Sequence, residues 1–104
     1  MDIILKFLTQ KIKNMSVFIV TFGLTANANN SNVITAIKSE VFWVKISDTV
    51  WFVKSDKDRV ELRESIFETA KIDLSYLMVI DISNSPWATY GVDQDITTWM
   101  KKNI

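Results

Sequence analysis

The side chains of this chain that could do chemistry are carboxylates, lysines and tryptophans, because its 104 residues include no histidine and no cysteine. That composition excludes thiolate nucleophiles, disulfides, zinc sites built from cysteine or histidine, and serine–histidine triads. A bound metal would need oxygen ligands and would be Mg²⁺ or a similar hard cation. The remaining possibilities are hydrolysis assisted by a metal ion that carboxylates hold, and binding without catalysis. No cofactor is predicted.

Two aspartates lie beside apolar, strand-like runs. Asp48 stands in the polar break 47–49 between two such runs, where a turn residue is the simplest interpretation. Asp81 stands near the end of another apolar run, where a buried, hydrogen-bonded structural role is favoured over a catalytic one. Asp81 is therefore only a weak candidate for a catalytic residue, and no metal site is predicted.

The charge balance gives nucleic-acid binding no general support, because twelve basic and twelve acidic residues cancel. A local strip of lysines could still contact phosphates if the fold brought its members together. An ordinary solvated surface is the favoured interpretation, because the net charge is zero. The lysines of this candidate strip are Lys45, Lys54, Lys101 and Lys102.

Four tryptophans in a chain this short are compatible with an aromatic-rich interface, although core packing is the favoured explanation for each one taken alone. Trp87 stands apart because it lies in a predicted loop beside Pro86 and Tyr90, where interface and core remain equally open. Trp87 is therefore a candidate binding residue. Trp43 and Trp51 are candidates for a dimer interface.

Residues 41–55, with the sequence VFWVKISDTVWFVKS, predict a β-hairpin of two strand-like runs. Neither face of it is polar, because Phe42 and Val44 point one way whereas Val41 and Trp43 point the other. An antiparallel sheet with one solvated face alternates polar and apolar residues. This hairpin therefore predicts a sheet that is covered on both faces.

The rest of the chain predicts further strands at 17–24 and 75–83, the first apolar on both sides and so central. The order βαββαβ, followed by a final helix, predicts an α+β, ferredoxin-like domain over 15–104. Its four strands form one antiparallel sheet with both main helices on one face. The first expected helix is 32–40, and its buried residues are Val33, Ile34 and Ile37. The second is 57–71, capped by Ser55 or Asp56, and its buried residues are Val60, Ile66, Phe67 and Ala70. The final helix is 93–103, and its buried residues are Ile96, Trp99 and Met100.

The N-terminal extension, residues 1–14, carries apolar residues at helical spacing and has three interpretations. It is a helix that covers an apolar surface, an addition from an upstream start codon, or the charged part of a signal peptide that spans Met1 to Ala28. The strand-like content of 17–24 favours the first two and a cytoplasmic protein, with secretion as the alternative. No apolar run is long enough to span a bilayer.

A sheet with both main helices on one face leaves the other face, expected to carry Trp43 or Trp51, without internal cover. The terminal segments are too short to cover all of it. A homodimer packed sheet against sheet is the preferred solution. The alternative is a monomer whose terminal segments close the face.

From the second strand of the hairpin onward, the sequence has a W-x-V-K strand at Trp51, Val53 and Lys54, then an R-x-x-L helix, then a closing segment with Trp87, Trp99 and Lys102. In this order of features it resembles small bacterial proteins related to the CRISPR-associated Cas-two family, often called SinR-family proteins. The resemblance covers roughly 15–104. It implies a ferredoxin-like protomer, a dimer and an association with nucleic acid.

The same resemblance weakens a nuclease function. Nucleolytic relatives carry an aspartate at the end of the first strand, where Mg²⁺ can sit in the dimer cleft, but here Gly23 occupies that position. Glycine offers neither a ligand nor a base. The nearest substitutes in sequence are Asp48 and Asp81.

Three functions follow as hypotheses. The favoured one is a non-catalytic dimeric module that binds a protein or a nucleic-acid backbone. The second is a metal-dependent ribonuclease or DNase, such as a toxin, which would use Mg²⁺. The third is an inhibitory protein of a mobile element, with the polar loop 27–32 as a binding surface.

Overall fold

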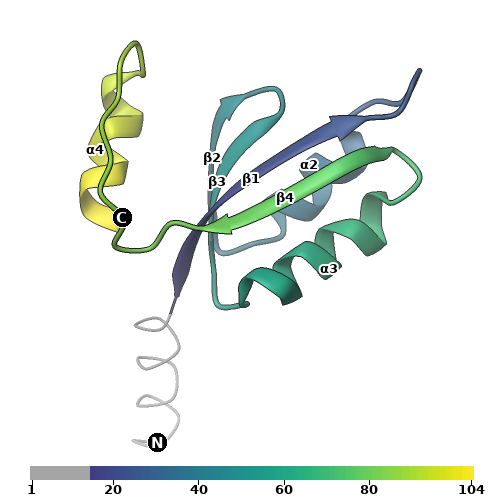
Figure 1. The fold of residues 1–104 in the computed structure, drawn as a ribbon, viewed down its shortest axis with the longest axis horizontal. Helices are drawn as coiled ribbons and strands as arrows, with labels where there is room; N and C mark the ends of the chain where they lie inside the picture. Colours follow the sequence, from purple (N-terminus) through teal and green to yellow (C-terminus); the bar gives the residue numbers. More distant parts are fainter. Residues whose placement is uncertain (1–14) are drawn as a thin grey trace, which may run out of the picture.

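The computed structural model describes residues 15–104, which form one four-stranded sheet and three helices (Figure 1). The extension 1–14, with its predicted docking helix, lies outside the described residues. The elements are β1 (Ser16–Leu24), α2 (Ser31–Lys38), β2 (Phe42–Ser47), β3 (Val50–Ser55), α3 (Arg59–Ala70), β4 (Leu74–Asp81) and α4 (Gln94–Asn103).

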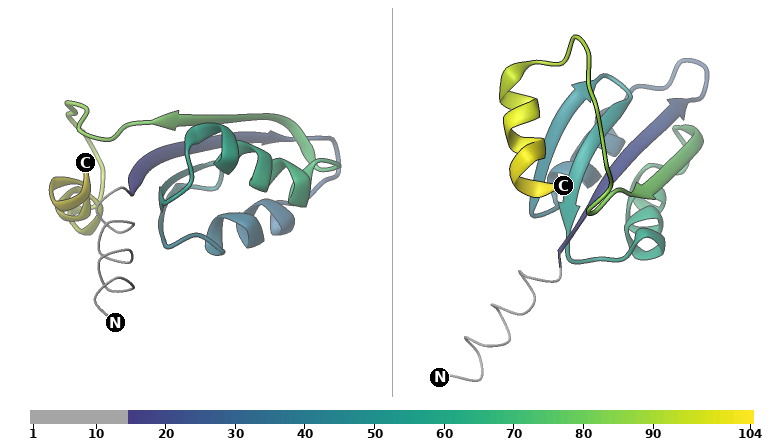
Figure 2. Two further views of the ribbon diagram at one scale, coloured as in Figure 1. Left: turned by 90° about the horizontal axis from the view of Figure 1, so that it is seen from below. Right: turned by 60° about the vertical axis from the view of Figure 1, so that its left-hand side comes forward.

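The sheet is antiparallel throughout and has the strand order β2-β3-β1-β4. Helices α2 and α3 lie on one of its faces, whereas α4 lies at the end of the sheet near the chain's C-terminus (Figure 2). The predicted α+β, ferredoxin-like fold with a C-terminal helix is confirmed. Strands β1 and β3 are central, and β2 and β4 are the edges.

The register shows which side chains face the two helices. Trp51 lies opposite Val20, and Val53 lies opposite both Phe18 and Trp43. Directly opposed residues of antiparallel strands point to the same face. Trp51 is 2% exposed within the core under α2 and α3. The expectation that Trp43 or Trp51 marks the uncovered face is therefore wrong, because both point to the covered one.

Helix α3 begins with a capping box. The carboxylate of Asp58 accepts from the backbone N–H of Glu61 at 2.8 Å, and the Glu61 side chain accepts from the backbone N–H of Asp58 at 3.3 Å. This arrangement satisfies two N–H groups that a helix start leaves unpaired. The predicted caps, Ser55 and Asp56, are wrong, because the chain makes a further turn before α3 begins.

The buried stripe of α3 is Leu62, Ile66 and Ala70. These residues are four apart and follow one narrow line along the helix. The predictions for Ile66 and Ala70 are confirmed, but Val60 and Phe67 are exposed. The predictions for α2 hold, since Val33 and Ile37 are fully buried and Ile34 packs against the core.

A buried polar cluster joins the end of α2 to the connection between β3 and α3. The hydroxyl of Ser55 donates to one carboxylate oxygen of Glu40, and Lys57 Nζ lies 2.9 Å from the other. Ser55 Oγ also accepts from the backbone N–H of Lys57 at 3.1 Å. Buried polar groups are costly unless paired, and here both carboxylate oxygens of Glu40 have donors.

Helix α4 covers part of the second sheet face through Trp99. The Trp99 ring stacks on Phe42 at 5.8 Å and on Phe52 at 5.9 Å between ring centroids. Both phenylalanines lie on the face opposite to α2 and α3, by the register of β2 and β3. The predicted inner stripe of α4 is thus confirmed, with Met100 buried and Ile96 and Trp99 half-buried.

Strand β1 contains nearly all of residues 15–24, the apolar region of the alternative signal peptide. Cleavage after Ala28 would therefore remove a central strand of the sheet. Among residues 15–104, no helix has the length and apolar character that a membrane span requires.

Candidate functional site: the uncovered strip of β4

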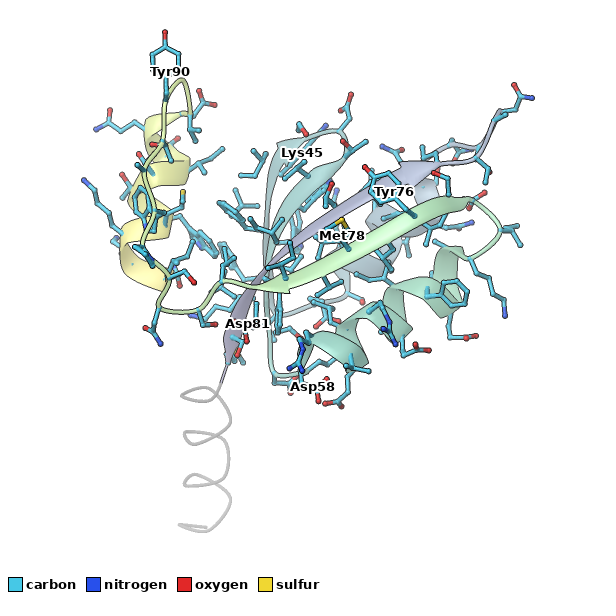
Figure 3. All side chains as sticks on the ribbon, in the orientation of Figure 1. Lys45, Asp58, Tyr76, Met78, Asp81 and Tyr90 are labelled. Atoms are coloured by element: carbon cyan, nitrogen blue, oxygen red, sulfur yellow. The ribbon has the colours of Figure 1, made fainter. Side chains whose placement is uncertain are left out.

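Three apolar residues of β4 remain open to solvent on the second face. Tyr76, Met78 and Ile80 are 51%, 50% and 44% exposed. They alternate along the strand and so share one face, opposite to Leu77 and Val79, which pack against the core (Figure 3). We call Tyr76, Met78 and Ile80 the β4 strip.

The β4 strip lies along an edge of the sheet, because β4 has β1 on one side and no further strand on the other among the described residues. Helix α3 packs against the covered face of β4. The strand therefore has an open face and an open edge at the same place. Exposed apolar groups that adjoin each other in this way are typical of interaction surfaces.

Gly23 lies next to the β4 strip and directly opposite Tyr76. A Cβ atom on Gly23 would collide with Cε1 of the Tyr76 ring, and it would lie 2.7 Å from the Ser75 Oγ. The ring therefore covers the backbone of β1 at Gly23. Glycine is needed here for the close approach of an aromatic side chain.

The two candidate carboxylates have local structural partners. Asp48 lies in the turn between β2 and β3, as predicted, and forms an exposed ion pair with Lys45 at 3.0 Å. Asp81 accepts from the backbone N–H of Ser83 at 2.9 Å at the end of β4. The predicted hydrogen bond of Asp81 is thus present, but its predicted burial is wrong because the side chain is exposed.

Metal ligands do not gather in the described part of the chain, where no group of three or more acidic residues could hold an ion. Asp48 belongs to the hairpin turn, and Asp81 belongs to the far end of a strand on the other side of β1. The structure therefore does not bring these two carboxylates together.

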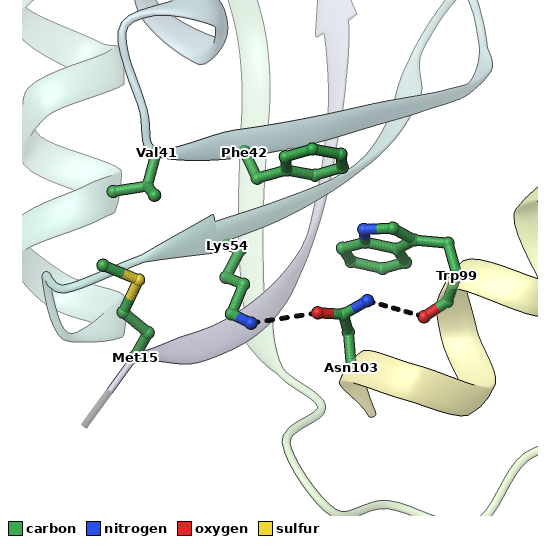
Figure 4. A pocket seen from close by; sticks show the side chains of 6 residues that line it. All are labelled: Met15, Val41, Phe42, Lys54, Trp99 and Asn103. Atoms are coloured by element: carbon green, nitrogen blue, oxygen red, sulfur yellow. Dashed lines mark hydrogen bonds between the residues drawn. The ribbon is translucent and has the colours of Figure 1, made fainter. Parts of the chain in front are cut away.

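The candidate lysine strip is divided between two faces. Lys45 lies opposite Trp51 and so points to the helix-covered face, whereas Lys54 lies opposite Phe42 on the other face. Lys54 Nζ donates to the Asn103 side chain of α4 at 2.9 Å (Figure 4). The remaining two lysines are exposed in the last turn of α4, where cations complement the helix dipole: Lys101 and Lys102.

The tryptophans expected at an interface are used within the chain. The Trp43 ring lies 5.7 Å from that of Trp51, and Lys38 Nζ of α2 lies 4.8 Å from the Trp43 ring centroid. Trp87 remains 37% exposed and lines an apolar pocket of about 290 Å³ together with Ile19 and Met100. Trp87 therefore packs the segment after β4 onto the second face.

A second pocket, of about 420 Å³, lies between β2, β3 and α4 (Figure 4). Its lining includes the stacked aromatic pair Phe42 and Trp99, together with Met15 and Val41. Asn103 closes one side, since its Nδ2 donates to the Trp99 carbonyl at 2.8 Å. The second face is thus covered by α4 on the hairpin side and open on the β4 side.

One ionisable group among the described residues has a clearly shifted pKa. The backbone N–H of Glu61 that donates to Asp58 holds the pKa of this carboxyl below its usual value. Figure 3 places Asp58 at the start of α3, away from the β4 strip. This shift is thus a property of the helix cap.

Sequence reasoning did not single out the β4 strip. The alternation of Tyr76, Met78 and Ile80 was visible in the sequence, but each half of an apolar strand is equally able to face the core. Comparisons of the chain with protein-family models, with curated proteins and with solved structures found no match. The resemblance to Cas-two-like proteins therefore stays a prediction from the sequence.

Proposed function

We propose that the protein is a non-catalytic interaction module that works as a homodimer and binds through the β4 strip. The observation that carries this proposal is the row of half-exposed Tyr76, Met78 and Ile80 on an edge strand. Burying such side chains contributes free energy in proportion to the apolar area removed from water. Within residues 15–104, α4 covers the other side of the same face and leaves the strip open to a partner.

A protein surface suits this strip better than a nucleic-acid backbone. Phosphate binding draws on clustered lysines and arginines, and the net charge of this chain is zero. Lys45 is paired with Asp48, and Lys54 is bound to Asn103. The β4 strip itself contains no cation. These points support protein–protein association as the binding mode.

The absence of a carboxylate at Gly23 supports a role without turnover. The ring of Tyr76 occupies the space above this glycine, and Asp81 is engaged at the end of its own strand. A nuclease of this fold would need oxygen ligands that converge on one ion. Incubation with RNA and DNA in Mg²⁺, with an Asp81→Ala comparison, tests this part of the proposal, and metal-dependent cleavage lost in the variant would overturn it.

Light scattering of the full chain tests the dimer. We expect a solution mass of twice the 12.0 kDa of one chain at micromolar concentration. Met78→Glu places a charge in the centre of the β4 strip and should return the mass to that of one chain. The matched control is Val41→Glu, which changes an equally exposed apolar residue just before β2, at the opposite edge.

Two results would contradict the proposal. The first is a wild-type chain that stays monomeric at all concentrations tested. The second is a dimer that Met78→Glu leaves intact while Val41→Glu disrupts it, because the contact would then lie on the other side of the sheet. Circular dichroism of both variants confirms that their folds are kept.

A further inference from the structure

We infer that two copies of the chain join by antiparallel pairing of their β4 edges, with Met78 at the two-fold axis, to form one eight-stranded sheet. This inference rests on the proposed homodimer and specifies how it is built. It depends on the backbone of β4 as well as on its side chains.

The backbone groups of β4 divide between β1 and the open edge. The N–H of Ile82 donates to the Val17 carbonyl at 2.8 Å, and the same register pairs Ile80 with Ile19. In an antiparallel ladder, alternate residues direct both N–H and C=O toward the neighbouring strand. Even-numbered residues of β4 therefore bond to β1. Odd-numbered ones, such as Leu77, direct their backbone groups outward.

The two edges of the sheet differ in a way that favours β4. Soluble proteins protect edge strands with lysines, prolines, short length or a covering helix. Strand β2 has six residues, carries Lys45 and is packed by Trp99 of α4. Strand β4 has eight residues, none of them charged or proline before Asp81 at its end. Within residues 15–104, β4 therefore lacks these protections, and its one irregularity is the register shift between Gly23 and Leu24 at the start of the strand.

Side-chain area alone would not hold a dimer. A standard stable interface buries about 800 Å² on each partner. The three half-exposed side chains of the strip supply roughly 100 Å² each, judged from the area that aromatic residues bury. A contact of face against face over the strip is therefore too small. Pairing along the edge adds backbone hydrogen bonds and brings the flanking residues of both copies together.

The register follows from the strand's own sequence. A ladder centred on Met78 places Leu77 opposite the second copy's Val79 as a hydrogen-bonded pair, which suits their outward backbone groups. Tyr76 then lies opposite the second copy's Ile80, on the open face. Aromatic and β-branched residues pair favourably across strands.

The same register also determines what lies opposite Asp81, the one charged residue of β4. Asp81 falls at the start of the second copy's β4, where a register shift between Gly23 and Leu24 interrupts the regular pairing. Its side chain is exposed on the single chain. Like charges directly opposite each other would be destabilising, and this arrangement keeps the two aspartates at opposite ends of the ladder. The strand is thus complementary to a second copy of itself.

Single cysteines test the register cleanly, since the chain has none of its own. At the axis, Met78→Cys would form a pair with Cα atoms about 4.5 Å apart, within the range that a disulfide bridges. We expect a disulfide-linked dimer from Met78→Cys under mild oxidation. Tyr76→Cys and Ile80→Cys should form one only when mixed, because identical positions lie four residues, about 13 Å, apart along the ladder. Val41→Cys is the negative control.

A proline variant separates edge pairing from other dimers. Val79→Pro removes an outward N–H and places a ring on the open edge, while the bonds to β1 come from the even-numbered residues. We expect it to be monomeric by light scattering, whereas the control Val79→Ala, which removes a similar part of the side chain, stays dimeric. If circular dichroism shows that Val79→Pro does not fold, the cross-linking of the Met78→Cys, Tyr76→Cys and Ile80→Cys variants alone tests the edge pairing.

The outcomes distinguish this inference from the proposed function. A wild-type monomer would overturn both. A wild-type dimer in which neither Met78→Cys alone nor any mixture of the three cysteine variants cross-links would overturn the edge pairing and leave the homodimer standing. So would a folded Val79→Pro variant that stays dimeric. Cross-linking of Tyr76→Cys with Met78→Cys in place of the predicted pair would show a shifted register and would overturn the axis at Met78.

Discussion

Replacing Trp99 by alanine should release α4 from the sheet without unfolding the domain. The indole lies against both Phe42 and Phe52, with interplanar angles of 9° and 14°. Met100 is the one fully buried residue of α4. The helix is therefore held to the second face chiefly by this aromatic stack, with help from the hydrogen bond between Lys54 and Asn103.

The expected loss follows from the two ring contacts and the buried area. Each aromatic pair contributes about 0.5–1.5 kcal/mol beyond burial, so two pairs contribute roughly 1–3 kcal/mol. Trp99 is half-buried, and its lost burial adds about 1 kcal/mol, half of the roughly 1.5–3 kcal/mol for a fully buried large side chain. The total, about 3 kcal/mol, is less than the 5–15 kcal/mol that typical domains possess. The loss should therefore appear as local detachment of α4.

Amide hydrogen exchange followed by mass spectrometry measures this directly. In Trp99→Ala the amides of 94–103 should exchange close to the rate of an unfolded peptide, while those of β1 keep their protection. Trp99→Phe keeps a stacked ring and is the conservative control, and Trp87→Ala removes an indole outside the stack. Unchanged protection of α4 in Trp99→Ala, with a free energy of unfolding within 0.5 kcal/mol of wild type by urea denaturation, would refute the reasoning.

Three further changes probe the packing and the cap. Glu40→Ala should lower the free energy of unfolding in urea by about 2 kcal/mol, because the buried Ser55 hydroxyl loses its acceptor. Gly23→Ala should cost about 1 kcal/mol in the same assay, near the lower limit for overpacking, because the half-exposed Tyr76 ring can move aside. Wild type should be more stable than Asp58→Ala, and this difference in stability should be complete above the ordinary carboxyl pKa of about 3.9. The difference should disappear as pH falls through the lowered pKa of Asp58, and thermal melts of both proteins at several pH values measure it.

Each of these has a control. Glu40→Gln keeps an acceptor for Ser55 and should cost less than Glu40→Ala; equal losses would mean that the hydroxyl is not the cause. The penalty of Gly23→Ala should vanish in a Tyr76→Ala background, and an additive double mutant would contradict the contact. A wild-type advantage over Asp58→Ala that grew on acidification would contradict the sign of the pKa shift.

The hairpin and the element order were predictable because they depend on local patterns. Two β-branched and aromatic runs around 47–49 indicate two strands, and the observed β2 and β3 meet there at Asp48 and Thr49. The strand order followed from the sequence of elements and the usual handedness of their connections. The Asp58 cap was also within reach, because an aspartate followed by a glutamate three residues later is a capping-box signature.

The face of the sheet that the helices cover was not predictable in the same way. Trp51 and Phe52 are neighbours of similar apolar character. The alternation of a strand places them on opposite faces of the sheet, but it does not indicate which of the two faces the helices cover. The choice depends on the register of β3 against β1, which sets Trp51 beside Val20 of the core. For the same reason the contact of Trp99 with Phe52 joins residues 47 positions apart that no local pattern relates.

The exposed residues of α3 have a consistent explanation in the proposed dimer. Val60 and Phe67 are seven apart, share one helix face, and are exposed in a single chain. Antiparallel pairing of two β4 edges requires a two-fold axis perpendicular to the sheet, which keeps the helices of both copies on the same face. Because α3 packs against β4, the two α3 helices then flank the seam. The seam would thus place α3 of each copy, with its exposed Val60 and Phe67, on the same face of the joined sheet.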